Sequence, residues 1–254
     1  KEKFPNKTNF IPHALPEQLF YPIEDNKKKI SKREILGVGR EDHFVAIWVN
    51  RNAKRKRPSD ILSSWSLFLN KIQEKYGHKK ATLIMHTDPF DQEGPNLLAV
   101  SENLGIQNNV LMSSDRIDFE KMNVLYNISD CCINMSYAEG FGLSTLESMM
   151  TGTPIIAAKT GGLTRQVVNY KDKSENGVGL DIKMKTLVGS QSVPYIYEDY
   201  ASCSDAADAF LKLFEMNDSE RDMLSEKVLN YARKEFSMQK TVDLWHETMI
   251  KKIK

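Results

Sequence analysis

One stretch constrains the fold of this chain more than any other: residues 136–154, which read SYAEGFGLSTLESMMTGTP. The apolar run DCCINM (Asp130–Met135) precedes it, and a second apolar run, PIIAA (Pro154–Ala158), comes after it. Short apolar runs around a glycine turn and a helical segment are typical of parallel α/β sheets. We therefore expect a strand, a loop, a helix and a strand. The helix should run from about Leu143 to Met150 and end at Gly152 and Pro154.

Two glutamates lie eight positions apart in this stretch: Glu139 before the Gly-Phe-Gly turn and Glu147 within the helix. Glu139 should lie at the carboxyl end of its strand, the edge where open parallel sheets bind ligands. The first helical turn exposes backbone N–H groups beside Gly140 and Gly142, which favour an anion by about 0.3–1 kcal/mol. Three other interpretations stay open. Ser144 to Glu147 fits a capping box, Glu139 fits a solvated loop acid, and the two glutamates fit a glycoside hydrolase pair.

Taken as one string, the two glutamates, the Gly-Phe-Gly turn, the helix and the Gly-Thr-Pro exit closely resemble the E-x7-E motif of the retaining glycosyltransferases of family four, which have the GT-B fold. The resemblance extends from about Phe10 to Val168. It implies that this chain is the C-terminal, nucleotide-sugar-binding half of a two-domain enzyme. Ile11-Pro12-His13 and Phe20-Tyr21-Pro22 match the segment that joins the two domains in that family, with Ala14 in place of the usual glycine.

Composition describes an ordinary globular chain. It has 254 residues, 41% apolar and 27% charged, with a net charge of +1, so nothing global indicates nucleic acid or an acidic membrane surface. No apolar run approaches the roughly 20 residues of a membrane span. Cys131 and Cys132 should point to opposite faces of a strand and Cys203 is remote, which predicts no disulfide framework and a cytoplasmic location. No cluster of metal ligands is visible, and no metal or cofactor is expected.

The rest of the chain alternates between strands and helices. Strands are expected at 44–49, 82–85 and 110–112, and helices at 58–76, 96–104 and 119–128. Residues 159–163 should form a loop that leads into a further helix, which runs through Val168. This order predicts an α/β fold, a Rossmann-like parallel sheet with helices on both faces. We expect a linker at 1–22, a donor-binding domain at 23–254, an insertion at 171–200, as a hairpin or flap, and C-terminal helices at 205–254. The last helix should carry an apolar stripe that consists of Met238, Val242, Trp245 and Met249. In GT-B enzymes this helix crosses back onto the N-terminal domain, which is expected to be missing from this chain.

A basic run, Arg51 to Arg57, comes directly after the first strong strand at the same predicted sheet edge as Glu139. Such a run also fits a nuclear localisation signal, a nucleic-acid patch or a solvated charge cluster. In the resembling family a strand there ends in an arginine followed five or six residues later by a lysine, and both contact the donor's pyrophosphate. Arg51 and Lys56 match that pattern. Arg57 stands where the family usually has glycine, which leaves the path of the loop open.

Carried over from the motif, the catalytic residues are Glu139, Arg51 and Lys56. The resemblance implies that Glu139 faces the donor sugar and that Glu147 accepts hydrogen bonds from the ribose. The chain contains no Asp-x-Asp sequence, so the two cations and the helix N-terminus would neutralise the leaving diphosphate without a metal, with retention at the anomeric carbon. The remaining substrate-binding candidates are Gly140, Phe141, Gly142 and Leu143 around the phosphate and sugar, and Val110, Leu111 and Met112 beside the base.

The resemblance does not name the donor. GDP-mannose, UDP-glucose and UDP-N-acetylglucosamine are all used within the fold family, and we favour GDP-mannose without a residue that decides it. The acceptor is unknown because the N-terminal acceptor domain is not in this chain. Two alternatives remain: a nucleotide-sugar-binding module without activity of its own, and a nucleic-acid-binding α/β protein that uses residues 51–57. Gly37-Val-Gly39 comes before its strand and is not the dinucleotide-binding motif, which argues against a dehydrogenase.

Overall fold

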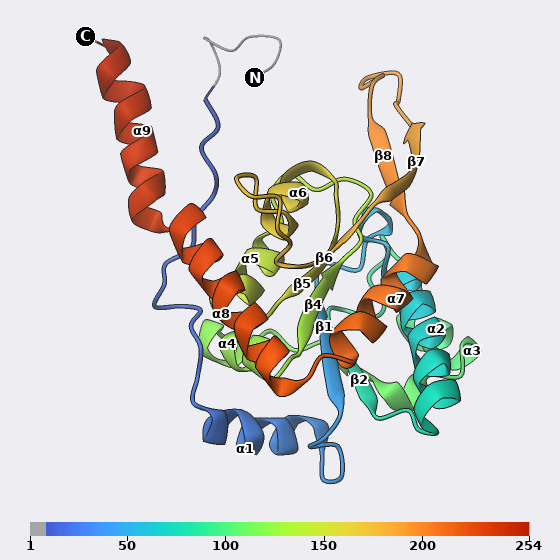
Figure 1. The fold of residues 1–254 in the computed structure, drawn as a ribbon. Coiled ribbons are helices and arrows are strands. Elements are labelled where there is room, and N and C mark those ends of the chain that lie inside the picture. The colour runs from blue at the N-terminus through green and yellow to red at the C-terminus, as the bar shows by residue number, and fades with distance from the viewer. Residues whose placement is uncertain (1–8, 254) are drawn as a thin grey trace.

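The centre of the computed structural model, which describes residues 9–253, is a six-stranded parallel sheet (Figure 1). Residues 1–8 of the expected linker and residue 254 of the expected helical tail lie outside the described residues. The strand order is β3-β2-β1-β4-β5-β6. This confirms the Rossmann-like parallel sheet. The strands are β1 (Phe44–Val49), β2 (Ala81–His86), β3 (Val110–Ser113), β4 (Cys131–Asn134), β5 (Ile155–Ala158) and β6 (Gly177–Leu180).

Helices cover both faces of the sheet, and each face has its own apolar core. One core contains side chains of α2 (Pro58–Tyr76), α3 (Leu97–Asn103) and α7 (Cys203–Phe214). The other contains side chains of α4 (Phe119–Asn127), α5 (Leu143–Met150), α6 (Gly161–Val167) and α8 (Asp218–Glu235). Cys131 belongs to the first core and Cys132 to the second, so the two thiols point to opposite faces as predicted.

Each covering helix buries the apolar side that its sequence spacing predicts. In α2 the residues Ile61, Trp65, Phe68 and Ile72 recur every three or four positions and are all fully buried. Phe210 of α7 packs on this face, with its ring centroid 5.1 Å from that of Trp65. Burial of such large side chains contributes roughly 1.5–3 kcal/mol each, so these faces fix the helices against the sheet.

The order of the strands reverses at β1. This strand pairs with β2 on one side and with β4 on the other, both in parallel. The connections after β1 and β4 therefore leave the sheet in opposite directions and open a crevice between them, which is where open α/β sheets bind ligands. The loop after β1 contains a short 3-10 helix, η1 (Lys54–Lys56), and a second, η2 (Gln107–Asn109), precedes β3.

The insertion expected at 171–200 is corrected in part. Gly177–Leu180 is β6, a member of the core sheet that pairs with β5. Its two glycines and short length hide it from pattern reading. The hairpin expectation is confirmed for the residues after β6: β7 (Ile182–Leu187) and β8 (Tyr197–Ala201) form an antiparallel pair. This hairpin projects beyond the edge of the core sheet (Figure 1).

One helix has no counterpart in the sequence prediction. α1 (Asp25–Leu36) reads DNKKKISKREIL, and among its residues only Leu36 is buried. Apolar periodicity is nearly absent, so the main signal for a helix is missing. It ends at Gly37, whose φ of 88° allows the chain to turn toward β1.

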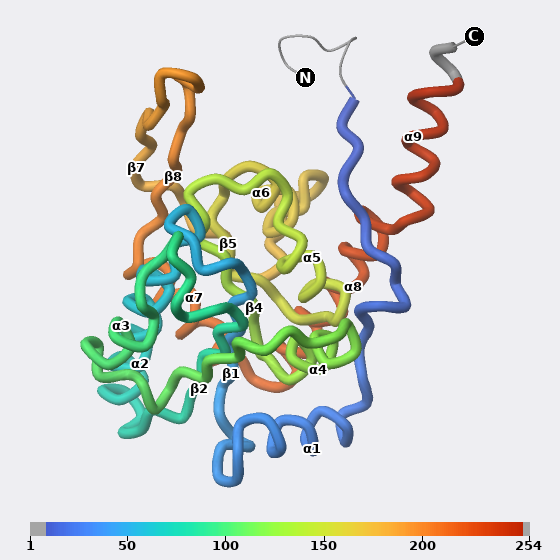
Figure 2. The backbone as a smooth tube through the Cα atoms, turned by 180° about the vertical axis from the view of Figure 1, so that it is seen from behind, coloured from blue at the N-terminus to red at the C-terminus, as the bar shows by residue number. Residues whose placement is uncertain are grey.

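The two ends of the described chain lie side by side (Figures 1 and 2). Asn9 Nδ2 donates to Thr248 Oγ1 at 3.2 Å, and Thr241 Oγ1 donates to the Pro12 carbonyl at 3.3 Å, which joins the lead segment to α9 (Met238–Ile253). The predicted apolar stripe of α9 lies here and each of its four side chains is about half exposed. Among the described residues, no helix combines the length and apolar character that crossing a bilayer requires.

Candidate functional site

Lys56 and Glu139 meet where the sheet changes direction. Lys56 ends η1 in the loop after β1, and Glu139 lies in the loop after β4. Lys56 Nζ forms an ion pair with Glu139 Oε2, and the two side chains are only 10% and 12% exposed. Burial lowers the pKa of Lys56, and the Glu139 carboxylate partly opposes that effect. The structure thus brings together two of the three predicted catalytic residues.

A cavity of about 340 Å³ opens at this edge of the sheet. Lys56 and Glu139 line it together with the turn that leads into α5, so most of the predicted phosphate- and sugar-binding residues surround one space. The lining residues are His13, Val49, Asn50, Lys56, Glu139, Phe141, Gly142, Leu143 and Ser144.

The Gly-Phe-Gly turn is built for close approach of a ligand. Gly142 is the N-cap of α5, with φ 91°, and no side chain within the described part of the chain caps the N–H groups of the first turn. A Cβ atom at Gly142 would lie 2.6 Å from Leu163 Cδ2, and one at Gly162 would lie 2.5 Å from the Gly140 carbonyl oxygen. A Cβ at Gly140 would meet nothing within 4 Å. Residues of α6 therefore pack closely against one side of the turn, whereas the space beside Gly140 is empty.

Gln166, a fully buried residue of α6, holds this turn in place. Its Nε2 donates to the carbonyls of Phe141 at 2.8 Å and Gly142 at 3.0 Å, and its Oε1 accepts from Thr145 Oγ1 at 2.5 Å. Gln166 thus fixes the carbonyls of two residues, Phe141 and Gly142, that line the cavity at the start of α5. No local pattern in the sequence indicates this role of Gln166.

Glu147 does not form a capping box, so that interpretation is wrong. Ser144 lies inside α5 after the Gly142 cap, and Glu147 Oε2 instead accepts a hydrogen bond of 2.7 Å from the hydroxyl of Tyr126 on α4. Burial raises the pKa of Glu147, and the Tyr126 hydrogen bond opposes that rise. Glu147 is half-buried on the helix that begins at the cavity.

Arg51 lies apart from Lys56 and Glu139. Its Nε and Nη2 donate to the two carboxylate oxygens of Asp91 at 2.7 and 3.1 Å, and its side chain is 64% exposed. Arg55 is nearer, with Nη1 3.8 Å from Glu139 Oε2. The catalytic role predicted for Arg51 stays a prediction, and it requires Arg51 to exchange Asp91 for the ligand.

Arg57 stands where the resembling family usually has glycine, and its backbone conformation shows how the loop runs there. Its φ and ψ are 57° and 43°, the left-handed conformation that a glycine adopts readily. Arg57 therefore holds a conformation that the usual glycine would adopt without strain. The buried guanidinium donates to Asp60 at 2.7 Å and to the Ala201 carbonyl at 3.0 Å, and it lies 5.0 Å from the ring centroid of Tyr137 and 5.5 Å from that of Tyr200.

These contacts anchor the β7–β8 hairpin to the site. Arg57 and Tyr137 belong to the loops after β1 and β4, whereas Ala201 and Tyr200 belong to β8. The Asp199 N–H also donates to the Tyr137 carbonyl at 2.8 Å. The hairpin is thus attached two residues from Glu139, a link that no local sequence pattern indicates.

Val110, Leu111 and Met112 form most of β3, the strand at one edge of the sheet. All three are half-buried, and none lines the cavity at Glu139. Their predicted contact with the base stays a prediction.

Two residues of the cavity were missed in the sequence. Asn50 comes directly after β1, and its Nδ2 is buried with no hydrogen-bond partner within residues 9–253. His13 comes from the lead segment, with its ring 5.1 Å from that of Phe141. Asn50 had a usable signal, because a polar residue directly after a buried parallel strand lies at the ligand-binding edge.

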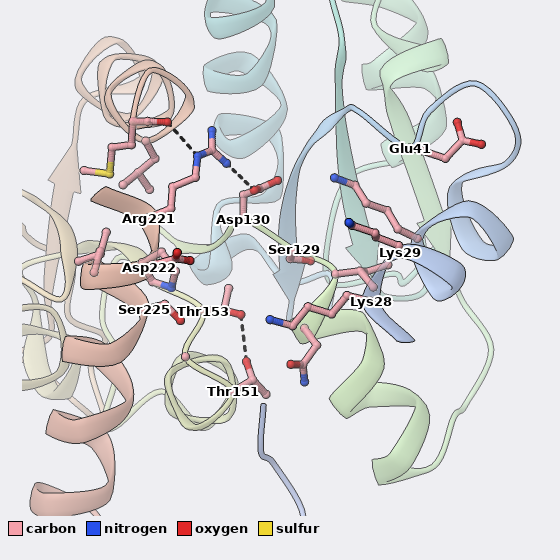
Figure 3. Close-up of a pocket in the computed structure, with 18 residues that line it drawn as sticks. Lys28, Lys29, Glu41, Ser129, Asp130, Thr151, Thr153, Arg221, Asp222 and Ser225 are labelled. Carbon is pink, nitrogen blue, oxygen red and sulfur yellow. Dashed lines mark hydrogen bonds and ion pairs between the residues drawn. The ribbon is translucent and has the colours of Figure 1, made fainter. Parts of the chain in front are cut away.

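A second cavity, of about 360 Å³, lies at the opposite end of the sheet (Figure 3). It is lined by lysines of α1 and by the residues that precede β4 and β5. Two pairs of its polar groups bond to each other: Arg221 to Asp130 at 2.6 Å, and Thr151 Oγ1 to Thr153 Oγ1 at 3.0 Å. Because it opens at the amino ends of the strands, it is separate from the site at Glu139.

One known protein family matches more than half of this chain. The family model described as "Glycosyl transferases group 1" matches residues 31–188. D-inositol 3-phosphate glycosyltransferase of Corynebacterium jeikeium is 28% identical over 239 residues, which cover 93% of this chain and 50% of that protein. Curated relatives of this description are longer than the chain, which spans 33% of the one from Segniliparus rotundus.

Two solved structures share the fold. Anabaena HepE in complex with UDP-glucose has a TM-score of 0.70 and 17% identity, over 94% of this chain and 56% of that one. The C-terminal domain of the group 1 family glycosyl transferase LpcC from Francisella tularensis has a TM-score of 0.64 and 19% identity, over 89% of this chain and 100% of that one.

Proposed function

The chain belongs to the group 1 glycosyl transferases, and on that premise we propose that it is the donor-binding half of a retaining, metal-independent glycosyltransferase. The observation that carries this proposal is the placement of Lys56, Glu139 and the open N-terminus of α5 around one cavity at the switch point of the sheet. A cation, a carboxylate and free backbone N–H groups are the groups that a nucleotide sugar needs there.

The chemistry assigns a role to each group. Transfer breaks the bond between the anomeric carbon and the diphosphate oxygen, so negative charge grows on the leaving nucleoside diphosphate. Lys56 and the first turn of α5 stabilise that charge in a partly dry site, where fixed charges act more strongly than in water. Glu139 stabilises the positive charge that develops near the anomeric carbon, and Glu147 accepts hydrogen bonds from the ribose hydroxyls.

Without a donor, the two charged side chains of the site form an ion pair with each other. With no donor bound, Lys56 and Glu139 neutralise each other, which limits the cost of holding both charges in a buried position. A donor offers each group a new partner: its diphosphate for Lys56 and its sugar hydroxyls for Glu139. Asn50 Nδ2, buried and without a partner among the described residues, supplies a further donor for a diphosphate or sugar oxygen.

Several observations support the assignment to one half of a two-domain enzyme. The chain spans half of the Corynebacterium jeikeium relative, and the LpcC C-terminal domain is matched over its whole length. The lead segment and α9 run side by side, and the apolar stripe of α9 is half exposed, as expected of segments that continue to another domain. The acceptor and the overall reaction depend on that other half.

Calorimetry with UDP and GDP in the presence of EDTA tests the proposal. We expect one of the two nucleotides to bind without metal, and hundredfold excess over Kd to stabilise the fold by about 2.7 kcal/mol. Complete loss of binding on chelation would overturn the metal-free assignment, and no binding of either nucleotide would overturn donor binding itself. GDP-mannose as donor stays a prediction. The UDP-glucose complex of HepE makes UDP the first nucleotide to titrate.

The two alternatives are distinguishable. A nucleic-acid surface needs the basic run to be exposed, yet Lys56 and Arg57 are buried and Arg51 is paired with Asp91. Salt-dependent binding to DNA or RNA without nucleotide binding would favour that alternative. A donor-binding module without activity would bind the nucleotide and still fail to transfer sugar when joined to its acceptor half.

A further inference from the structure

The buried hydroxyl of Tyr126 is bonded to the side chain of Glu147 on α5. Tyr126 lies on α4, is fully buried, and packs its ring against Phe20 at a centroid distance of 5.8 Å. A buried tyrosine needs a partner for its hydroxyl, and a backbone carbonyl would serve. Tyr126 uses the Glu147 carboxylate instead, at 2.7 Å. The contact joins α4 to α5 across 21 residues of sequence.

The carboxylate it holds belongs to the helix that begins at the cavity, although Glu147 is not itself among the residues that line the cavity. Leu143 opens the helix at the cavity, and Glu147 lies one turn later on the same face. Oε2 is occupied by Tyr126, whereas Oε1 accepts no hydrogen bond within residues 9–253. One oxygen is therefore fixed by the protein and the other is left for a ligand.

We propose that Tyr126 is a positioning residue for nucleotide binding: its hydroxyl orients the Glu147 carboxylate so that Oε1 receives the ribose hydroxyls. This inference rests on the proposed function. Tyr126 lies outside the stretch at 136–154 that predicted the site. The inference predicts that Tyr126 affects nucleotide affinity only through the contact between Glu147 and the ribose.

The physical reason lies in the last torsion of a glutamate. Rotation about this sp³–sp² bond is broad, so an unrestrained carboxylate samples many orientations. The Tyr126 hydroxyl removes that freedom before the ligand arrives, and pre-organisation of this kind improves affinity by reducing the ordering that binding requires.

The hydrogen bond also acts on the charge of Glu147. Burial raises the pKa of this carboxyl, and the Tyr126 hydrogen bond favours its ionised form. The Glu147 charge also acts on Cys132 of β4: burial, and then this charge, raise the pKa of the Cys132 thiol to about 12. Cys132 is thus a neutral, weak donor near pH 7, and the Tyr126 hydroxyl is the strong one.

Tyr126→Phe and Glu147→Gln, singly and together, test the proposal by calorimetry with UDP and GDP. Phenylalanine keeps the buried ring, so thermal unfolding should change little. For the nucleotide that binds, Tyr126→Phe should weaken affinity about three- to tenfold in the wild-type background and leave it unchanged in the Glu147→Gln background. Affinity for the matching 2′,3′-dideoxy nucleoside diphosphate should be the same with and without the Tyr126 hydroxyl.

Each other outcome has a distinct meaning. Equal losses for the ribose and dideoxy nucleotides, or an undiminished loss in the Glu147→Gln background, would show that Tyr126 acts through the fold and would overturn the positioning role. Wild-type affinity in Tyr126→Phe would overturn it as well, while leaving donor binding intact. Failure of the wild-type protein to bind either nucleotide would overturn the positioning role together with the proposed function.

Discussion

Lys56 and Glu139 are 83 residues apart in the sequence, and they form an ion pair across the point where the strand order reverses. Each comes after a parallel strand, β1 or β4, and these two strands are neighbours in the sheet. The pair therefore results from topology: the carboxyl ends of adjacent parallel strands place their loops on one edge. It also joins the group that would hold the diphosphate to the group that would face the sugar.

Lys56→Met should weaken binding of the nucleoside diphosphate about ten- to a hundredfold, because a hydrogen bond to a charged group contributes about 1.5–3 kcal/mol. Methionine keeps the unbranched side chain in its buried place. Lys54→Met is the matched control, since Lys54 lies in the same short helix and is exposed. Calorimetry that finds equal effects for the two variants would assign the role to general charge, not to the position of Lys56.

Arg57 allows a test of backbone strain. Arg57→Ala and Arg57→Gly both remove the guanidinium, but only alanine must hold a Cβ in the left-handed conformation. The glycine variant should therefore be more stable than the alanine variant by about 1–2 kcal/mol in urea unfolding. At Lys54, in the right-handed η1, the order should reverse, with glycine the less stable. Equal stability of the two Arg57 variants would show that the loop relaxes away from this conformation.

Much of this architecture was readable in the sequence because it depends on local chemistry. Gly142, Gly152 and Pro154 delimit α5, and the apolar runs before and after it are β4 and β5. The buried faces of the helices match the three- and four-residue spacing of large apolar side chains. The predicted place of Glu139 at a ligand-binding edge depends only on the parallel strand before it.

The rest was hidden for identifiable reasons. β6 has two glycines in four residues, and α1 buries only Leu36, so neither shows periodicity. The direction of a long cationic side chain is decided by partners remote in sequence: Arg51 lies on Asp91, 40 positions away, while Lys56 lies on Glu139. Sequence spacing matched both cations to one pattern, but tertiary contacts separate them.

Glu147 should give nucleotide binding a distinct pH dependence. Its pKa is raised from 4.5 by burial, and the ionised form is the better acceptor for ribose hydroxyls. Affinity should therefore fall as the pH falls through this raised pKa, at a higher pH than for an ordinary glutamate. The stability of the nucleotide-free protein has the opposite sign: the contribution of Glu147 is present at low pH and is lost as the pH rises from 4.5 through the raised pKa.

Calorimetry and urea unfolding from about pH 4, below the ordinary pKa of a glutamate, up to about pH 8 would measure both effects, with Glu147→Gln as the control. The terminal phosphate of the nucleotide also titrates, near a pKa of about 6, but it does so equally for both proteins. The ratio of their affinities therefore isolates the carboxyl. A ratio that is constant across this range would show that Glu147 does not contact the ligand in its ionised form.

Glu139→Gln separates binding from transfer once the chain is joined to its acceptor half. The substitution keeps the shape of the side chain and removes its charge, which also releases Lys56 from its ion pair. Affinity for the bare nucleoside diphosphate should stay near normal or increase, since Lys56 no longer exchanges one partner for another. Transfer should slow at least about tenfold with little change in KM, because the carboxylate acts mainly as the anomeric carbon becomes cationic. Steady-state kinetics and calorimetry on the same variant decide the matter: full turnover, or loss of bare-nucleotide binding, would mean that Glu139 does not act on the sugar.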